Sequence, residues 1–289
     1  MTMKSLPVLL LLGAVTLAHA RHDRWEDAAT AEETIEKTFS VSPSGTAALD
    51  LDNIWGSIEV TGTSGNQIQV HITKSIRAAS PEDLALAQKE VTLDVTQDAD
   101  SVRLYVNGPF RCCENTFNCG HLAERRYVVK MDFRVRVPER IALKLATVNE
   151  GRVSVENVVG SYRIRNVNGD ITMRNVGGSG EAKTVNGPVK VSFRENPRED
   201  SEFSTINGDV ELVFAKSPDA DFRFKTFNGD IYSDFDLTAL PLASPTTERR
   251  NGRFVYKSDR YTGGRAGSGG PEIKLENLNG NLRVLERAS

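Results

Sequence analysis

The chain has 289 residues, of which 26% are charged and 39% hydrophobic, and its formal net charge is −3. This balance is typical of a globular protein and excludes a disordered or collagen-like chain. The weakly acidic charge provides no electrostatic footprint for nucleic acid or for an anionic membrane surface. The part of the chain beyond residue 20 is long enough for one large domain or two ordinary ones.

The first twenty residues have the three parts of a secretory signal. Lys4 supplies a positive charge, an apolar run extends from Leu6 to Leu17, and Ala18-His19-Ala20 fits an A-x-A cleavage site. This run is shorter than the about 20 residues that span a bilayer, and no later stretch is apolar enough to do so. We therefore expect residues 1–20 to be a signal peptide. The mature chain would then be exported to the periplasm or the exterior, without an integral membrane segment.

The segment between the leader and the first strands is predicted to be a mobile arm, residues 21–37, because it lacks a long apolar stripe. Alternating apolar residues from position 38 predict strands, and we interpret 38–137 as an N-terminal β capping region for the repeats of the C-terminal half. One helix is expected there, residues 81–90, with Ser80 as its cap and Pro81 at its first position.

The densest group of reactive side chains lies between residues 112 and 121: Cys112, Cys113, Cys119 and His121. Four such ligands could hold Zn²⁺, but structural zinc sites usually separate their paired cysteines by two or more residues. In an exported chain a disulfide from Cys119 to Cys112 or Cys113 is the favoured hypothesis. A thiol or metal-binding module is the weaker alternative.

The most informative pattern is a recurring phrase, apolar-Asn-Gly-polar-apolar. Asn149, in a looser copy, and the next four asparagines of the pattern stand 19, 18, 21 and 21 residues apart. Near-constant spacing of this length indicates stacked units. The Asn-Gly pairs, which we expect to form structural corners, are Asn168-Gly169, Asn186-Gly187, Asn207-Gly208, Asn228-Gly229 and Asn279-Gly280.

Each repeat alternates apolar and polar residues, as a strand with one buried face does. Asn and Gly tolerate positive φ, so the pair can form a corner between two strands. Locally, Asn-Gly also predicts a hairpin and hence an antiparallel meander. The constant period favours a β-solenoid instead. We therefore predict a solenoid over 138–289, with a loop insertion at 232–272 where the period breaks and a second corner recurring at Asn157 and Asn175.

Stacking would align two kinds of polar side chain at the corners. The asparagines are expected to form a hydrogen-bonded ladder inside the wall. The carboxylates of Asp170, Asp209 and Asp230 would form a second column. Such a column could bind Ca²⁺. The favoured interpretation is that each Asp caps backbone amides of its turn.

The Asn-Gly-Asp-Ile phrases, with the segment Gly269 to Leu275 (GGPEIKL) before Asn279-Gly280, resemble the bacterial DUF4097 family of putative adhesins. The resemblance covers roughly residues 38–287. It implies a β-solenoid-like, non-enzymatic, exported protein, and it brings no catalytic residues to this chain.

No G-x-S-x-G, H-E-x-x-H or phosphate-loop motif occurs in the sequence. We therefore predict an all-β, single-chain β-solenoid with no catalytic residues and no cofactor. Its expected function is that of an adhesin or of a surface or periplasmic scaffold that binds an unidentified macromolecule or surface polymer. The alternative is a polysaccharide-acting β-helix enzyme, which would need a groove with converging carboxylates.

Overall fold

The computed structural model describes residues 28–42, 47–111, 126–241, 246–250, 253–257 and 261–287, with only the backbone for 246–248, 250 and 253–257. The chain divides into two compact units, Met1–Val153 and Ser154–Ser289, a division that falls later than the expected boundary at 137/138. Apart from helix α1 (Pro81–Glu90), the regular structure in the described part is β-strand. The predicted all-β class with one short helix is confirmed.

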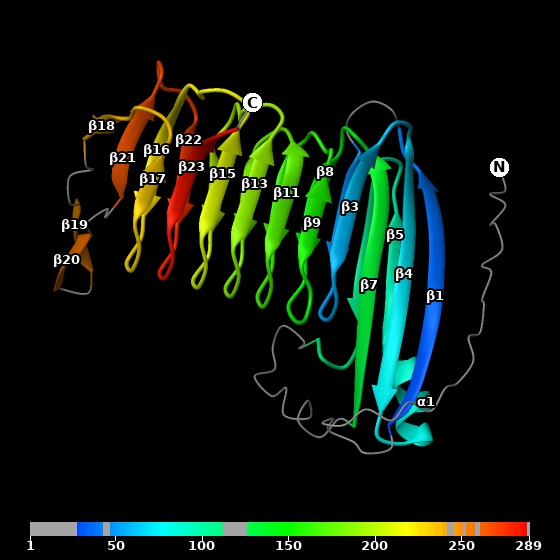
Figure 1. Cartoon of the computed structure of the whole chain (residues 1–289). Helices are drawn as coiled ribbons and strands as arrows, with labels where there is room; N and C mark the ends of the chain where they lie inside the picture. The colour runs from blue at the N-terminus through cyan, green and yellow to red at the C-terminus, as the bar shows by residue number, and fades with distance from the viewer. Residues whose placement is uncertain are drawn as a thin grey trace. The chain divides into compact units, whose positions relative to one another are not determined.

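The first unit contains two groups of hydrogen-bonded strands (Figure 1). In the first group the three long strands pair antiparallel and the fourth strand, β3, pairs parallel to β7. Its order is β1 (Ala29–Ser40), β4 (Gln67–Ala78), β7 (Tyr127–Pro138) and β3 (Ile58–Thr63). The order in the second group is β5 (Thr92–Gln97), β6 (Ser101–Asn107), β2 (Ala48–Asp52) and β8 (Ala142–Ala146).

The prediction of a mobile arm is wrong for residues 29–37, because they belong to β1. This strand pairs with β4 along its whole length, from Ala29 opposite Ala78 to Ser40 opposite Gln67. Its side chains are half-buried or exposed, so it has no apolar stripe that periodicity could detect. Backbone pairing on one side is enough to form an edge strand. The expected signal peptide and residues 21–27 lie outside the described residues.

Helix α1 begins as the sequence predicts. Ser80 has extended backbone, and its side chain accepts a hydrogen bond from the backbone N–H of Asp83. The helix lies against β4 and β7. In β4, Lys74 is only 5% exposed, and its Nζ donates to the carbonyl of Val91, the residue after α1, at 2.8 Å. Burial is the main cause that lowers the pKa of Lys74, opposed by the charge of Glu33.

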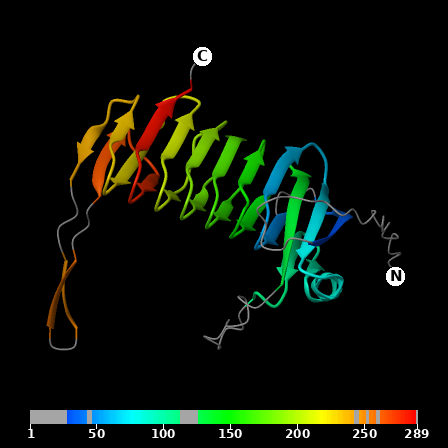
Figure 2. The same ribbon diagram turned by 60° about the horizontal axis from the view of Figure 1, so that its bottom comes forward.

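The second unit is a parallel β-solenoid, with strands from successive coils stacked in two sheets (Figures 1 and 2). Ile171 pairs with Val189, and Val189 with Val210, in parallel register. This pairing confirms the solenoid and excludes the antiparallel meander. One sheet has the order β9 (Val153–Glu156), β11 (Ile171–Val176), β13 (Val189–Phe193), β15 (Val210–Phe214), β23 (Leu282–Glu286) and β17 (Ile231–Ser233).

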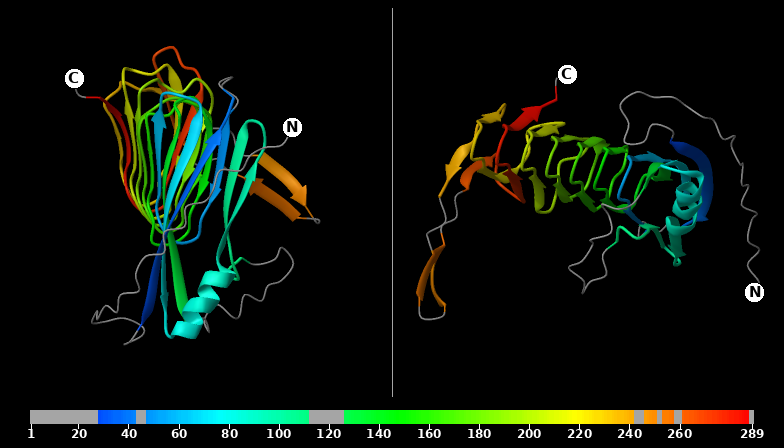
Figure 3. Two further views of the ribbon diagram at one scale, coloured as in Figure 1. Left: turned by 90° about the vertical axis from the view of Figure 1, so that its right-hand side faces the viewer. Right: turned by 90° about the horizontal axis from the view of Figure 1, so that it is seen from below.

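The other sheet of the second unit continues beyond β16, at one end, with two strands joined by antiparallel pairing. Its order is β10 (Tyr162–Arg165), β12 (Gly180–Lys183), β14 (Ser201–Ser204), β22 (Glu272–Glu276), β16 (Ala220–Lys225), β21 (Thr262–Ala266) and β18 (Thr238–Leu240). Viewed from the side in Figure 3, the strands of successive coils lie behind one another. Fully buried Phe193, Phe203, Phe214 and Phe222 fill the space between the two sheets.

The coils do not stack in the order of the sequence. The last coil of the chain is inserted before the preceding one, because β22 lies between β14 and β16 and β23 lies between β15 and β17. The corners therefore stack in the order Asn168, Asn186, Asn207, Asn279 and Asn228.

The segment 232–272 is more ordered than the expected loop insertion. The Gly-rich stretch from Thr262, within this insertion, begins with β21, and this strand pairs antiparallel with β16. The absence of a side chain at Gly263 leaves room for its partner in β18, because a Cβ there would lie 2.8 Å from the Cβ of Leu240. Strands β19 (Thr246–Arg250) and β20 (Arg253–Lys257) also pair antiparallel, with Arg250 opposite Arg253.

Candidate functional site

The Asn-Gly corners of the second unit share one hydrogen-bond pattern. The glycine N–H donates to the asparagine carbonyl of the next coil, as from Gly187 to Asn207 at 2.9 Å. In return, the N–H of Asn207 donates to the carbonyl of Val185 at 2.8 Å. The second corner also repeats: Asn157 and Asn175 have φ of 58° and 53°, and their side chains are hydrogen-bonded at 2.7 Å.

The corner asparagines form a ladder, but it lies outside the wall. Each Nδ2 donates to the Oδ1 of the preceding asparagine in the stack, at 2.7 to 2.8 Å. All five side chains, Asn168, Asn186, Asn207, Asn279 and Asn228, belong to exposed residues. The expectation of a buried ladder was therefore wrong in its position. These amides are part of the surface that the protein presents to solvent.

The polar column that does face inward stands two residues before each corner asparagine. Thr205 is 4% exposed and donates from Oγ1 to the carbonyl of Gly187 at 2.8 Å. The equivalent donors are Thr184 to Gly169, Asn277 to Gly208 and Thr226 to Gly280. The sequence analysis missed this column, although a Thr or Asn recurs at this position in every copy of the phrase. The Asn-Gly pair carries the stronger turn signal and obscures it.

The residue before each corner asparagine is apolar and points outward. Ile206 is 44% exposed, Leu278 46% and Phe227 73%, and Val167 and Val185 are half-buried. We call this row, together with the adjacent asparagine ladder, the corner surface: Val167, Val185, Ile206, Leu278, Phe227, Asn168, Asn186, Asn207, Asn279 and Asn228. Because the corners stack, it is one continuous strip of apolar and amide side chains.

The three aspartates of the expected column are not neighbours. Pro188 stands between Asp170 and Asp209, and the inserted last coil places Asn281 between Asp209 and Asp230. Asp209 caps the N–H of Asn281 at 2.8 Å and pairs with Arg283. Partial burial raises the pKa of Asp209, but these two contacts outweigh it and hold the pKa below its usual value. No group of three His, Cys, Asp or Glu suited to a metal ion occurs among the described residues.

The outer face of the sheet that contains β10, β12 and β14 carries ion pairs between neighbouring strands. Arg163 pairs with Glu181 at 3.0 Å and Lys183 with Glu202 at 2.8 Å. Partial burial raises the pKa of Glu181. Hydrogen bonds and charges from Arg165 and Lys183 lower it by more, so the pKa of Glu181 lies below its usual value. A general acid for glycoside cleavage requires the opposite shift.

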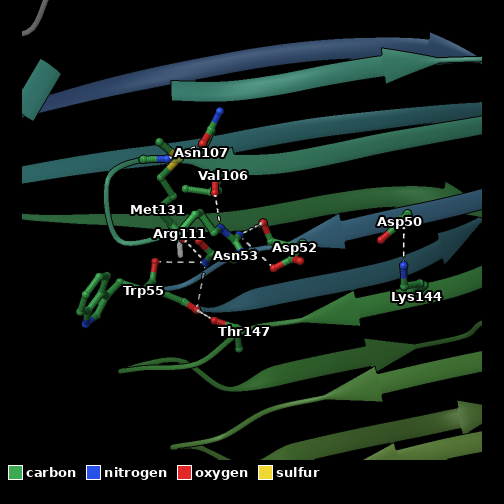
Figure 4. A network of polar contacts seen from close by, with 12 residues as sticks. Asp50, Asp52, Asn53, Trp55, Val106, Asn107, Arg111, Met131, Lys144 and Thr147 are labelled. Atoms are coloured by element: carbon green, nitrogen blue, oxygen red, sulfur yellow. Dashed lines mark hydrogen bonds and ion pairs between the residues drawn. The ribbon is translucent and has the colours of Figure 1, made fainter. Parts of the chain in front are cut away.

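In the first unit, a buried polar network surrounds the variant corner that begins at Asn53 (Figure 4). Asn53 is fully buried, and its Nδ2 donates to the carbonyls of Trp55, Gly56 and Met131. Trp55 takes the place of a ladder asparagine and bridges to Asn149. This network fixes the corner.

The same corner is clamped from one side by Arg111. Its guanidinium pairs with the carboxylate of Asp52 at 2.9 Å, donates to the carbonyl of Val106 and lies over the ring of Tyr105 at 4.2 Å (Figure 4). The neighbouring Phe110 contacts Trp55 edge to face, with ring centroids 5.7 Å apart. The expected disulfide and metal candidates after this point of the chain, Cys112, Cys113, Cys119 and His121, lie outside the described residues.

The parallel coils and Asn-Gly corners define the second unit as a β-solenoid repeat. Residues 140–263 match the family model described as Toastrack DUF4097, which confirms the resemblance derived from the repeated phrases. Comparison with curated proteins gives no match. In the described part of the chain, no helix has the length and apolarity to cross a membrane.

Several solved structures resemble the chain at low sequence identity. A putative cell adhesion protein from Clostridium sporogenes is 12% identical with a TM-score of 0.36, covering 88% of this chain and 100% of its own. A putative adhesin from Bacteroides fragilis is 13% identical with a TM-score of 0.38, covering 88% and 97%. A putative lipid binding protein from Parabacteroides distasonis is 10% identical with a TM-score of 0.32, covering 89% and 95%. Likeness at these TM-scores carries no inference about the function of this chain.

Proposed function

We propose that the mature protein is an exported, non-catalytic β-repeat scaffold that binds a macromolecule or surface polymer through its corner surface. The observation that supports this proposal is the row of exposed Ile206, Leu278 and Phe227 beside the asparagine ladder. Contiguous apolar side chains on a protein surface, bordered by polar groups, mark interaction sites. The corner surface combines both features in one strip.

The rigidity of the corners suits this role. Each coil is fixed by backbone hydrogen bonds, by the inward Thr or Asn column and by the outer amide ladder. Side chains that are already ordered lose little conformational entropy when they bind. Their spacing of about 4.8 Å, the distance between neighbouring strands, suits a partner whose own groups repeat.

The enzyme alternative has weaker support. The described carboxylates on the β10, β12 and β14 wall are ion-paired, and the pKa of Glu181 lies below its usual value. A polysaccharide-cleaving site would hold two carboxylates across an open groove, one of them with a raised pKa. No pair of this kind occurs in the part of this wall that the structure describes.

Cosedimentation tests the proposal. Purified mature protein is mixed with peptidoglycan sacculi or with outer-membrane vesicles, and the bound fraction is measured for wild type and for a triple variant, Ile206→Ser, Leu278→Ser and Phe227→Ser. We expect wild type to bind one of these materials and the triple variant to bind at least tenfold more weakly. The control carries Leu86→Ser and Val128→Ser, which change side chains 45% and 37% exposed away from the corner surface.

The outcomes separate the alternatives. Equal binding by the triple variant would remove the corner surface from the proposal. Release of new reducing ends from the sacculi by wild type would favour the polysaccharide enzyme. Export is tested separately, by mass spectrometry of the protein recovered from the periplasm and the medium, where we expect the chain to begin at Arg21.

A further inference from the structure

The two sheets of the second unit end differently beyond the last coil. In the sheet that contains β16, strands β21 and β18 continue the hydrogen bonding. In the other sheet β17 pairs only with β23, and in the described part of the chain no strand comes after it (Figure 1). Uncovered strand edges present unpaired N–H and C=O groups and are ready sites for another strand. The end of this sheet is therefore the strongest candidate for a further site.

The inner coils show which groups hold the following coil. Gly187 and Val189 donate their N–H groups to it, each at 2.9 Å. The following coil in turn donates hydrogen bonds to Val185 O, Asn186 Oδ1 and Gly187 O. One coil further along, Asp209 Oδ1 accepts a hydrogen bond from the N–H of Asn281 in the coil that follows it. A coil holds the following one through five such groups, and through six where an Asp follows the corner glycine, as Asp209 does.

The last coil presents the same pattern with nothing bound to it in the described part of the chain. Its donors are the N–H groups of Gly229 and Ile231. Its acceptors are Phe227 O, Asn228 Oδ1, Gly229 O and Asp230 Oδ1. On its other side this coil is hydrogen-bonded to the preceding coil of the stack. There Asn228 N donates to Leu278 O, and Asp230 O accepts from Leu282 N. This end of the solenoid is already shaped for one more coil.

The surface around β17 is apolar and acidic, apart from Arg283, which lies over the ring of Tyr232 and is paired with Asp209. Phe227, Ile231 and Tyr232 are 73%, 39% and 47% exposed. Three carboxylates, Asp230, Asp234 and Asp236, lie within this segment, and residues 226–240 contain no Lys or Arg. None of these three forms an ion pair among the described residues. Natural edge strands are protected by short length, by charged side chains, by Pro or by a bulge. Strand β17 is short, at three residues, and its flanking charges are all negative, so a strand with basic side chains is the one that this edge does not repel.

We propose that β17 and the corner before it bind one extended peptide strand that carries Lys or Arg and lies parallel to β17 as an additional coil. Carbonyl oxygens of the peptide accept hydrogen bonds from the N–H groups of Gly229 and Ile231, and its own donors bond to the open acceptors of the coil. An apolar side chain of the peptide covers Ile231. Its basic residues match the three aspartates. This mode is β-strand addition, in which backbone hydrogen bonds give affinity and alternate side chains give specificity. The site lies at the end of the stack and goes beyond the function proposed for the corner surface.

A second copy of the chain fits this edge less well than a basic peptide. Two identical edges related by a two-fold axis pair antiparallel, whereas the open pattern of the corner requires a parallel strand. Such pairing would also bring two sets of Asp230, Asp234 and Asp236 together. Like charges opposite one another are destabilising.

The chain itself supplies a probe peptide. A fluorescent peptide with the sequence of residues 184–194 and the change Pro188→Asn, which supplies the backbone N–H for Asp230 Oδ1, contains a complete corner, Lys190 and Arg194, and no acidic residue. In the solenoid this segment comes directly after the coil that contains Asp170, so it is suited to pair with a coil that has Asp at that place. We expect wild-type protein to bind it in an anisotropy titration. We also expect Gly229 and Ile231 to gain protection from hydrogen exchange.

Two variants of the protein test the geometry and the charge separately. Ile231→Pro removes the outward N–H, a change that edge strands accept, and should weaken binding at least tenfold. Asp230→Lys should weaken it similarly by repulsion. The matched control is Asp170→Lys, at the same place in an inner coil, which should bind as wild type does. A probe with Lys190→Glu and Arg194→Glu should bind at least tenfold more weakly.

Several results would overturn the proposal. They are absence of binding by wild type, unchanged binding by both Ile231→Pro and Asp230→Lys, and protection that appears only at inner strands such as β15. A wild-type dimer in sedimentation that Ile231→Pro dissociates would assign the edge to a second copy instead. The double variant Ile206→Ser and Leu278→Ser separates this proposal from the one for the corner surface. It changes only the corner surface, so it should bind the peptide as wild type does, whatever its binding to sacculi or vesicles.

Discussion

Replacement of Gly208 by Ala tests whether the corners are held by close stacking. A Cβ at Gly208 would lie 2.3 Å from the carbonyl oxygen of Gly187 and 2.6 Å from its carbonyl carbon, distances that no side-chain Cβ tolerates. The φ of Gly208 is +154°, which adds backbone strain. The coil cannot shift away, because Gly208 N bonds to Asn279 O and its carbonyl accepts from Asn277.

The expected cost combines two terms. Backbone strain of this kind costs on the order of 1–3 kcal/mol, and an added methyl in a packed site costs roughly 1–3 kcal/mol. We therefore expect Gly208→Ala to lower the free energy of unfolding of the second unit by about 2–6 kcal/mol. Gly65→Ala is the matched control, because Gly65 has φ of +120° and no atom within 4 Å of an added Cβ. It should cost only the backbone strain, about 1–3 kcal/mol.

Hydrogen exchange read by mass spectrometry is the suitable assay, since it resolves the two units. Both tryptophans, Trp25 and Trp55, precede the second unit, so tryptophan fluorescence does not report on it. Gly208→Ala should accelerate exchange in strands β13 and β15 and leave β4 and β7 unchanged. A change below about 0.5 kcal/mol, the range of ordinary surface substitutions, would show that the stack opens without cost and refute this reasoning. Equal losses for both variants would assign the effect to φ alone.

Three further predictions concern the second unit. Thr205→Val removes the donor to the buried carbonyl of Gly187 and should cost about 1–2 kcal/mol in urea unfolding, while Thr205→Ser should cost less than Val. The pKa of Asp209 is lower in the folded state than in the unfolded state. Its contribution to the free energy of unfolding is therefore present above about pH 4 and is lost as the pH falls through the folded pKa. Acid unfolding of Asp209→Asn should show a weaker pH dependence than wild type, and identical profiles would contradict this. Deletion of 272–289 should unfold the second unit in circular dichroism and exchange, whereas deletion of the hairpin 246–257 should leave its coils intact.

The repeat made the solenoid predictable. The spacing of the Asn-Gly phrases defined both the period and the corners, and parallel pairing of Ile171 with Val189 is the result that this period requires. The helix was equally accessible, because Ser80 and Pro81 are local signals that need no tertiary contact. These features depend on residues close together in the sequence.

Other features depend on contacts between distant residues. Thr205 points inward and Asn207 points outward, although they stand two residues apart in the sequence. The backbone turns at the corner, so the alternation of apolar and polar residues does not predict which side each of them faces. Strand β1 is stabilised by pairing with β4 and not by burial. The place of the last coil is set by contacts such as Asp209 with Asn281, 72 residues apart, and the sequence contains no signal for that order.

The position of the last coil sets a time order for folding. When residues up to 240 have been synthesised, the coil of β16 and β17 has no correct neighbour, because β22 and β23 must first lie between it and the coil of β14 and β15. The stack is therefore completed only when the last residues of the chain arrive. A nascent chain of this design can complete its second unit only after residues 272–286 have been synthesised, so the stack closes from its C-terminal coil.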